Sequence, residues 1–104
     1  MKAKVYIIHD LGKLNFDPAA EFGELVMCVT GHVNANQLPR AIERLHAKLS
    51  KITPNDYIVA AGHPALIAIA GAYQVNETGY LKMLCWDNQN NVYAPVEVKI
   101  YEDD

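Results

Sequence analysis

Residues 56–72 have the sequence DYIVAAGHPALIAIAGA, which carries the strongest structural signal in the chain. The apolar run at 57–61 shows no alternation, as is typical of a strand covered on both faces. Gly62 suits a turn, and Pro64 suits the first position of a helix, where its missing N–H is not needed. The stretch therefore predicts a buried strand, a turn and an apolar helix, the repeating unit of an α/β sheet.

The flanking sequence contains further strand and helix patterns. Apolar residues spaced by three and four positions predict an amphipathic helix over about 36–52, with Asn36 as its cap. Asp17, Pro18 and Gly23 predict a single helical turn that Asp17 caps. The remaining patterns predict strands at 3–8, 24–30, 80–86 and 92–101.

This order predicts one α/β domain over residues 1–104. Strand–helix–strand repeats require right-handed crossovers and favour parallel strands, and the last two strands predict an antiparallel hairpin. We expect a small Rossmann-like fold with two main helices and a mixed sheet of about five strands, mainly parallel with an antiparallel C-terminal hairpin. The direction of the first strand stays open, because the 11–23 connection is long enough for either direction.

The last predicted strand alternates between apolar and polar side chains, as is typical of a strand with one wet face. Pro95 cannot donate to a ladder, so we expect this strand at a sheet edge. Tyr93 and Tyr101 lie on its polar side. The acidic charge of the chain favours solvated edge residues there over a platform for stacked bases.

Composition narrows the class of protein. Hydrophobic residues make up 51% of the 104 positions, which predicts a folded domain with a core. The formal net charge of −3 argues against nucleic-acid binding and against adhesion to an anionic membrane. No apolar run reaches the ~18 residues of a membrane span, and the first residues lack a signal-peptide pattern. We therefore expect a cytoplasmic protein in which Cys28 and Cys85 are reduced thiols.

Three predicted strands end near a histidine: His9, His32 and His63. Ligands of open parallel sheets bind beyond the carboxyl ends of the strands, so neighbouring strands would bring these rings to one crevice. Together with a carboxylate such as Asp10 or Asp87, they are candidate ligands for zinc or iron. No local ligand spacing supports this metal site, and the alternative is that the histidines simply occupy turns.

A second hypothesis is an anion or nucleotide site at the start of the apolar helix. Free N–H groups at positions 65 and 66 would attract a phosphate or carboxylate. The expected ligand-binding residues are Gly31, His32, Gly62, His63 and Pro64. The stretch lacks the glycines of a GxGxxG loop and the lysine of a P-loop. We predict no catalytic residues and no cofactor, because no nucleophile motif occurs.

The apolar helix also predicts an interface between copies of the chain. A helix that is apolar all round must be covered all round, and one sheet covers one side only. Its small residues Ala68, Gly71 and Ala72 are candidates for a symmetric contact with a second copy. The alternative is that the first helix and the 11–23 loop cover this side.

Several stretches together resemble a known group of proteins. They lie at 15–24 (NFDPAAEFGE), 56–67 (DYIVAAGHPALI), 84–87 (LCWD) and 93–98 (YAPVEV). With them, the chain resembles small single-domain proteins of unassigned function that tailed bacteriophages carry. The resemblance implies a viral accessory protein in the host cytoplasm and supplies no activity.

We therefore predict a non-enzymatic accessory protein of phage type that acts through protein–protein contacts. Its expected partners are a second copy, as a homodimer, and a host or viral protein. The alternative is a small-ligand or nucleotide-binding module at the strand ends around Gly31-His32 and Gly62-His63. A metal-dependent hydrolase at the three histidines is the third hypothesis.

Overall fold

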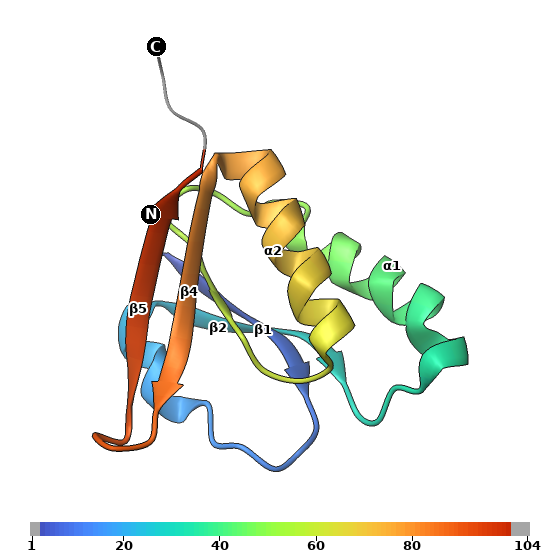
Figure 1. Ribbon diagram of the computed structural model, residues 1–104, viewed down its shortest axis with the longest axis horizontal. Helices are drawn as coiled ribbons and strands as arrows, with labels where there is room; N and C mark the ends of the chain where they lie inside the picture. Colours follow the sequence, from blue (N-terminus) through green and yellow to red (C-terminus); the bar gives the residue numbers. More distant parts are fainter. Residues whose placement is uncertain (1–2, 101–104) are drawn as a thin grey trace.

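The computed structural model describes residues 3–100, and within them all strands belong to one five-stranded sheet (Figure 1). The strands are β1 (Lys4–Asp10), β2 (Glu24–Thr30), β3 (Tyr57–Val59), β4 (Tyr80–Asp87) and β5 (Val92–Lys99). The helices are α1 (Leu38–Leu49) and α2 (Pro64–Thr78), with two short 3₁₀ helices, η1 (Asp17–Phe22) and η2 (Ala35–Gln37). In this part of the chain no helix is both long enough and apolar enough to cross a membrane.

The strand order in the sheet is β2-β1-β3-β4-β5. The pairings of β1 with β2 and β3, and of β3 with β4, are parallel, while β4 and β5 form an antiparallel hairpin. The mixed, mainly parallel sheet is thus confirmed, and the first strand is parallel to the second. The chain leaves β1 towards one edge and later crosses to β3 on the other side, so β1 and β3 flank a topological switch point.

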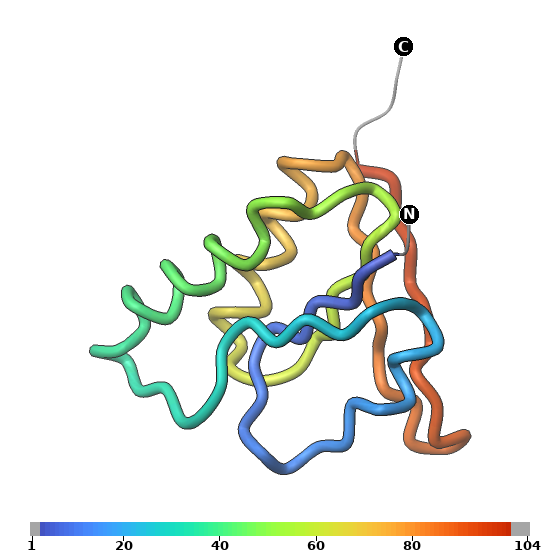
Figure 2. The backbone as a smooth tube through the Cα atoms, turned by 180° about the vertical axis from the view of Figure 1, so that it is seen from behind, coloured from blue at the N-terminus to red at the C-terminus, as the bar shows by residue number. Residues whose placement is uncertain are grey.

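The two α-helices lie next to each other on one side of the sheet, as two opposite views show (Figures 1 and 2). Leu45 of α1 and Leu66 of α2 share a buried cluster with Tyr6 of β1. Side chains alternate across a strand, so the neighbouring Ile7 faces the other way, towards Phe16 of the 11–23 connection. This connection, with η1, therefore covers the second face of the sheet.

Helix caps differ from the prediction. The helix expected from Asn36 starts as η2, and Asn34 forms the capping box, with its N–H donating to Gln37 Oε1 at 3.0 Å. η1 begins at Asp17 with Phe16 in the cap position, so Asp17 is not the cap. For the longer helix the error has a simple cause: Asn34 and Asn36 lie two positions apart, and only the backbone path selects which of them is the cap.

Strand β5 differs most from expectation. Its apolar side is not covered: Val92, Val96, Val98 and Ile100 are 38–48% exposed. Conversely, Tyr93 is 6% exposed, because it packs with Phe16 and Ala19 on the η1 side, so its predicted solvated position was wrong. Tyr101 lies outside the described residues. The hairpin therefore presents apolar side chains to solvent on the helix side of the sheet.

Candidate functional site

The predicted histidine site is organised by His9, which is 2% exposed near the carboxyl end of β1. The backbone N–H of His63 donates to His9 Nδ1 at 2.9 Å. A ring nitrogen that accepts a hydrogen bond carries no proton, so the ring proton lies on Nε2. Nε2 then donates to the carbonyl oxygen of Gly31 at 2.6 Å. His9 thereby ties together the ends of β2 and β1 and the turn after β3.

The His9 ring also occupies the space at the switch point. Gly62 has φ of 102°, and a Cβ atom added there would overlap His9 Cβ and Cγ. Doubly wound sheets hold their ligands at this end of the strands, between the two that flank the switch point. In this chain the His9 imidazole lies against Gly62 at this end of the strands.

The first backbone N–H groups of α2 already donate hydrogen bonds within the start of the helix. The N–H of Ala65 donates to His63 Nδ1 at 3.0 Å, which makes His63 the N-cap. The N–H of Leu66 donates to the carbonyl oxygen of His63, also at 3.0 Å. The expectation of free N–H groups at 65 and 66 was therefore wrong, and an anion at this terminus would have to displace these bonds.

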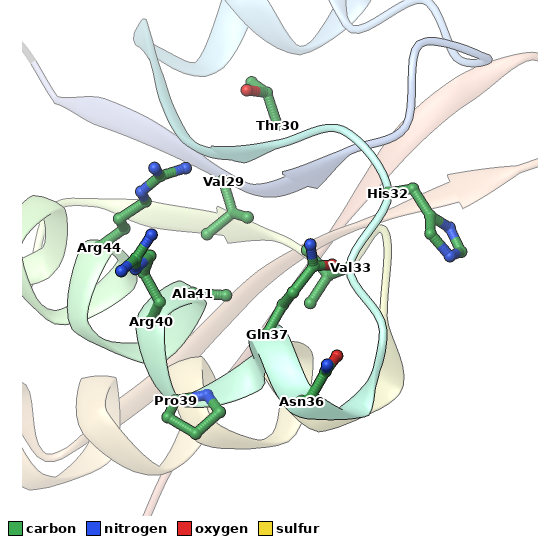
Figure 3. A pocket seen from close by; sticks show the side chains of 10 residues that line it. All are labelled: Val29, Thr30, His32, Val33, Asn36, Gln37, Pro39, Arg40, Ala41 and Arg44. Atoms are coloured by element: carbon green, nitrogen blue, oxygen red, sulfur yellow. The ribbon is translucent and has the colours of Figure 1, made fainter.

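Among the described residues, His32 forms no hydrogen bond with His9 or His63. It is exposed and lines a hollow of about 450 Å³ between the end of β2 and the start of α1, which we call the α1–β2 hollow (Figure 3). Arg40 and Arg44 extend side by side on its rim, one turn apart on α1, while the His32 ring points away from them. Among the described residues, neither guanidinium group has a hydrogen bond or ion pair. This hollow is the polar concavity that sequence reasoning missed, although the spacing of the two arginines was visible.

Metal binding gains no support from the geometry. Within residues 3–100, no group of three or more His, Cys, Asp or Glu side chains could hold a metal ion. Both ring nitrogens of His9 are engaged in the bonds described above. The two candidate carboxylates form hydrogen bonds within turns. Asp10 accepts from the N–H of Gly12 at 2.7 Å. Asp87 accepts from the Asn90 side chain, and this hydrogen bond lowers the pKa of Asp87.

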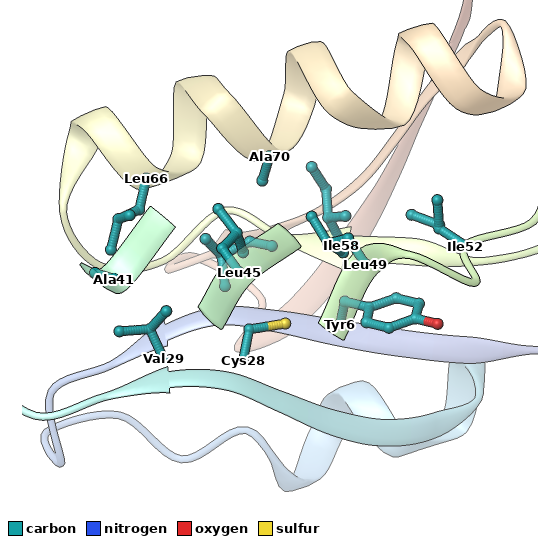
Figure 4. Packing of buried hydrophobic residues seen from close by; sticks show 11 residues of the cluster. Tyr6, Cys28, Val29, Ala41, Leu45, Leu49, Ile52, Ile58, Leu66 and Ala70 are labelled. Carbon is teal, nitrogen blue, oxygen red and sulfur yellow. The ribbon is translucent and has the colours of Figure 1, made fainter. Parts of the chain in front are cut away.

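Helix α2 is only partly covered. Its buried residues are Leu66, Ala70 and Gln74, and Leu66 and Ala70 point towards the sheet (Figure 4). The predicted interface residues lie away from this stripe: Ala68 and Ala72 are exposed, and Gly71 is half-buried. The first helix and the 11–23 loop were the alternative cover for these residues, and neither lines the surface around them. Helix α1 packs on the core side of α2, and the 11–23 loop lies on the opposite face of the sheet.

These residues belong to an apolar groove of about 550 Å³, which we call the α2–β5 groove. It is lined by Ile67, Ala68, Gly71, Ala72, Val75, Leu81, Met83 and Ile100. The lining contains no charged or polar side chain. The structure thus brings all three predicted interface residues onto one apolar surface beside β5.

A buried polar network at the other end of the strands was not predicted. Gln74 is 1% exposed, and its amide bonds both backbone groups of Lys82: Oε1 accepts from the N–H at 3.0 Å, and Nε2 donates to the carbonyl oxygen at 3.2 Å. Nε2 also reaches the carbonyl oxygen of Asp56 at 3.4 Å. Every buried side-chain polar atom in residues 3–100 has a partner, so this network stabilises the fold and offers no vacant donor.

Comparisons with known proteins agree with the resemblance in the sequence. No curated protein and no solved structure matches the chain. A family model described as "Phage Pam3 gp32-like protein" matches residues 3–100, which is nearly the full length. The predicted relationship to small phage proteins is thereby confirmed. The chain belongs to the Phage Pam3 gp32-like protein family.

Proposed function

We propose that this protein is a non-enzymatic phage accessory protein that acts through protein–protein contacts, beginning with a second copy of itself. The observation that carries this proposal is the α2–β5 groove together with the exposed valines of β5 beside it. Exposed apolar side chains on an edge strand favour contact with another chain, and proteins that remain monomeric normally avoid them. Large exposed apolar patches likewise mark interaction sites.

The magnitude of burial supports self-association. Val96, Val98 and Ile100 are 38–45% exposed. Fully burying such a side chain contributes about 1.5–3 kcal/mol, so covering the exposed part contributes about 1 kcal/mol for each. A symmetric contact doubles the sum, because each copy supplies the same surface. The groove residues on α2 add to this.

The histidines support a non-enzymatic role. His9 and His63 use their ring nitrogens for backbone hydrogen bonds, which is a structural use. We place the protein in the host cytoplasm, where a host or another viral protein is the alternative occupant of the same surface.

The test is the mass of the purified chain in solution, measured by light scattering from micromolar to submillimolar concentration. We expect a dimer whose population rises with concentration. Ala72→Asp places a charge in the α2–β5 groove and should give a monomer, whereas Ala47→Asp, on the exposed side of α1, should leave the dimer intact. A wild-type chain that stays monomeric throughout overturns the proposal, and so does equal loss of the dimer in both variants.

A second candidate function is the binding of a small anionic ligand in the α1–β2 hollow. Arg40 and Arg44 favour it, because two guanidinium groups one turn apart, neither in an ion pair among the described residues, repel each other, and an anion relieves this repulsion. A ligand that binds only the native state raises the midpoint of thermal unfolding. We expect phosphate or a nucleotide to raise it in the wild type and not in Arg40→Gln/Arg44→Gln, with Lys48→Gln as a control. No rise with any anion would contradict this candidate.

A further inference from the structure

A further hollow lies where the 11–23 connection meets the β4–β5 hairpin, two segments that are side by side in both views (Figures 1 and 2). Its volume is about 400 Å³. We call it the Trp86 hollow, and its lining includes Lys13, Leu14, Asn15, Trp86, Asn91 and Tyr93. It shares no residue with the α1–β2 hollow or with the α2–β5 groove, so the contacts proposed above leave it open.

Two aromatic rings of the hairpin form one wall of this hollow. Trp86 and Tyr93 lie directly opposite each other in the ladder of β4 and β5, so their side chains share a face of the sheet. The rings meet edge to face, with their centroids 4.9 Å apart. Tyr93 is 6% exposed and Trp86 is 42% exposed. The buried ring therefore holds the indole in place, and the indole supplies an open apolar surface.

The hydroxyl of Tyr93 has no partner within the described residues. No side-chain oxygen that is sealed from solvent in residues 3–100 lacks a hydrogen bond, so this hydroxyl is the tip of the residue that reaches the surface. The surface that Tyr93 lines is the Trp86 hollow. The hydroxyl of a buried tyrosine usually has a hydrogen-bond partner, and a ligand can supply the one that this residue lacks.

The other polar groups around the hollow are mainly donors. The indole N–H of Trp86 and the ammonium group of Lys13 can only donate, and neither has a hydrogen bond or ion pair among the described residues. Asn15 Oδ1 already accepts from the N–H of Asp17 at 3.0 Å, which leaves its NH₂ group. Within residues 3–100, no carboxylate lines the hollow. A matching ligand is therefore rich in acceptors, poor in donors and not cationic.

We propose that the Trp86 hollow binds a proline-rich segment of another protein in the extended polyproline II conformation. This backbone has no internal hydrogen bonds, so its carbonyl oxygens are free to accept, and proline has no N–H that needs an acceptor. Proline-rich segments of this kind dock in grooves lined by aromatic side chains. The five prolines of this sequence stand apart from one another, so a second copy does not supply such a segment.

Two classes of small molecule fit the lining less well. The hydroxyl groups of a sugar donate as well as accept, and the described lining offers no carboxylate to accept from them. A nucleotide sets several phosphate charges against the single ammonium group of Lys13. One cation suits one carboxylate, so the preferred segment carries an acidic residue next to its prolines.

The fluorescence of Trp86 reports binding directly, because it is the one tryptophan of the chain. The probe is a synthetic peptide of consecutive prolines followed by one glutamate. Its addition should shift the emission to shorter wavelength along a saturable curve, because the peptide covers the indole. A peptide of the same length and charge, made of glycine and serine with the same glutamate, should leave the emission unchanged.

Two substitutions test the assigned groups, with affinities measured by calorimetry. Tyr93→Phe removes only the unpartnered hydroxyl and should weaken binding roughly fivefold, whereas Tyr73→Phe, on α2, should not. Lys13→Gln should weaken binding of the glutamate peptide roughly threefold, and should not weaken binding of a proline peptide that ends in glutamine. Lys51→Gln, at an exposed position after α1, is the control for charge.

Ala72→Asp separates this surface from the proposed dimer contact. The variant should bind the proline peptide as tightly as the wild type, because residue 72 lines the α2–β5 groove and not the Trp86 hollow. Lost binding in this variant overturns the inference, since it moves the peptide to the dimer surface. Absence of any emission shift with the proline peptide overturns it as well, and so does a response to a sugar or a mononucleotide in its place.

Equal affinities of the wild type and Tyr93→Phe would likewise overturn the role of the hydroxyl.

Discussion

The imidazole of His9 fills the space that a side chain at Gly62 would need: a Cβ atom added to Gly62 overlaps His9 Cβ and Cγ. The φ of Gly62, 102°, also lies in the region that glycine alone adopts readily. Two independent constraints therefore require glycine here, one from the backbone and one from a side chain of β1. The contact, together with the hydrogen bond from the His63 N–H to His9, fixes the turn that starts α2.

Gly62→Ala should therefore destabilise the fold more than the same change at another glycine with positive φ. Gly12→Ala is the matched control, because Gly12 has φ of 81° and nothing within 4 Å of an added Cβ. The control should cost about 1–2 kcal/mol for the backbone alone, and Gly62→Ala at least about 2 kcal/mol more. Urea unfolding measures both, and equal midpoints would show that the His9 ring moves aside freely.

His9→Phe should destabilise the fold although it keeps a planar ring of similar shape. The substitution removes the acceptor of the His63 N–H and the donor to the Gly31 carbonyl oxygen. A backbone group that is left buried without a partner should lower the free energy of unfolding by about 1–3 kcal/mol. His32→Phe, at an exposed position, should change the free energy of unfolding little. Nitrogen NMR of the wild type should find the His9 proton on Nε2, and a proton on Nδ1 alone would contradict the hydrogen bonds.

His9 also shows what the sequence can and cannot predict. Hydrophobic periodicity is local, so the order of strands and helices and the buried face of α1 follow from it. The partners of His9 lie 22 and 54 residues away, and no local pattern specifies them. The sequence thus placed histidines at three strand ends, but it could not show that one ring would bond the other two turns.

The exposure of the apolar side of β5 could not be predicted from the sequence, for a related reason. Alternation in 92–100 correctly identified an apolar side, but exposure depends on what α2 covers. Leu81 and Met83 of β4 pack against the core below the helix, whereas Val96 and Val98, opposite them on β5, lie beyond it. Whether a helix covers the side chains of a strand depends on tertiary packing, whereas the alternation within the strand shows only which side chains share a face.

Leu66→Asp should prevent folding, because Leu66 is 0% exposed in the centre of the core. An unpaired charge there costs more than about 4 kcal/mol, a large share of the stability of a small domain. Ala68→Asp, two residues further on α2 but exposed, should fold with native circular dichroism. A soluble, fully folded Leu66→Asp variant would show that the helix is not part of the core.

The two thiols should react differently with a thiol reagent at pH 8. Burial raises the pKa of Cys28 to about 12, whereas Cys85 is only half-buried. In the native chain, one thiol per molecule should therefore react with the reagent, and Cys85→Ser should abolish this reaction. The second thiol should react only after unfolding. Rapid modification of Cys28 in the native chain would contradict its burial.

The same pKa predicts how stability depends on pH. The folded pKa of Cys28 lies above its ordinary value of 9.0, so the neutral thiol stabilises the fold fully below pH 9, and this contribution is lost as the pH rises towards about 12. The loss is at most about 1.4 kcal/mol per pH unit. Cys28→Ala should flatten the decrease in unfolding free energy between these pH values, and an unchanged slope would assign the decrease to other groups.

Gln74 fills a gap in the parallel ladder, and its replacement should destabilise one strand edge in particular. The pairs between β3 and β4 begin at Ile58 with Met83, one residue beyond Lys82, and the Gln74 amide instead bonds both the N–H and the C=O of Lys82. Gln74→Met keeps the length of the side chain but leaves both groups buried without a partner, at about 2–4 kcal/mol. Gln89→Met, in the exposed hairpin turn, is the control. Hydrogen exchange separates this cause from lost packing: the Lys82 amide should lose protection well before its neighbours in β4, and uniform loss along the strand would contradict a ladder role for Gln74.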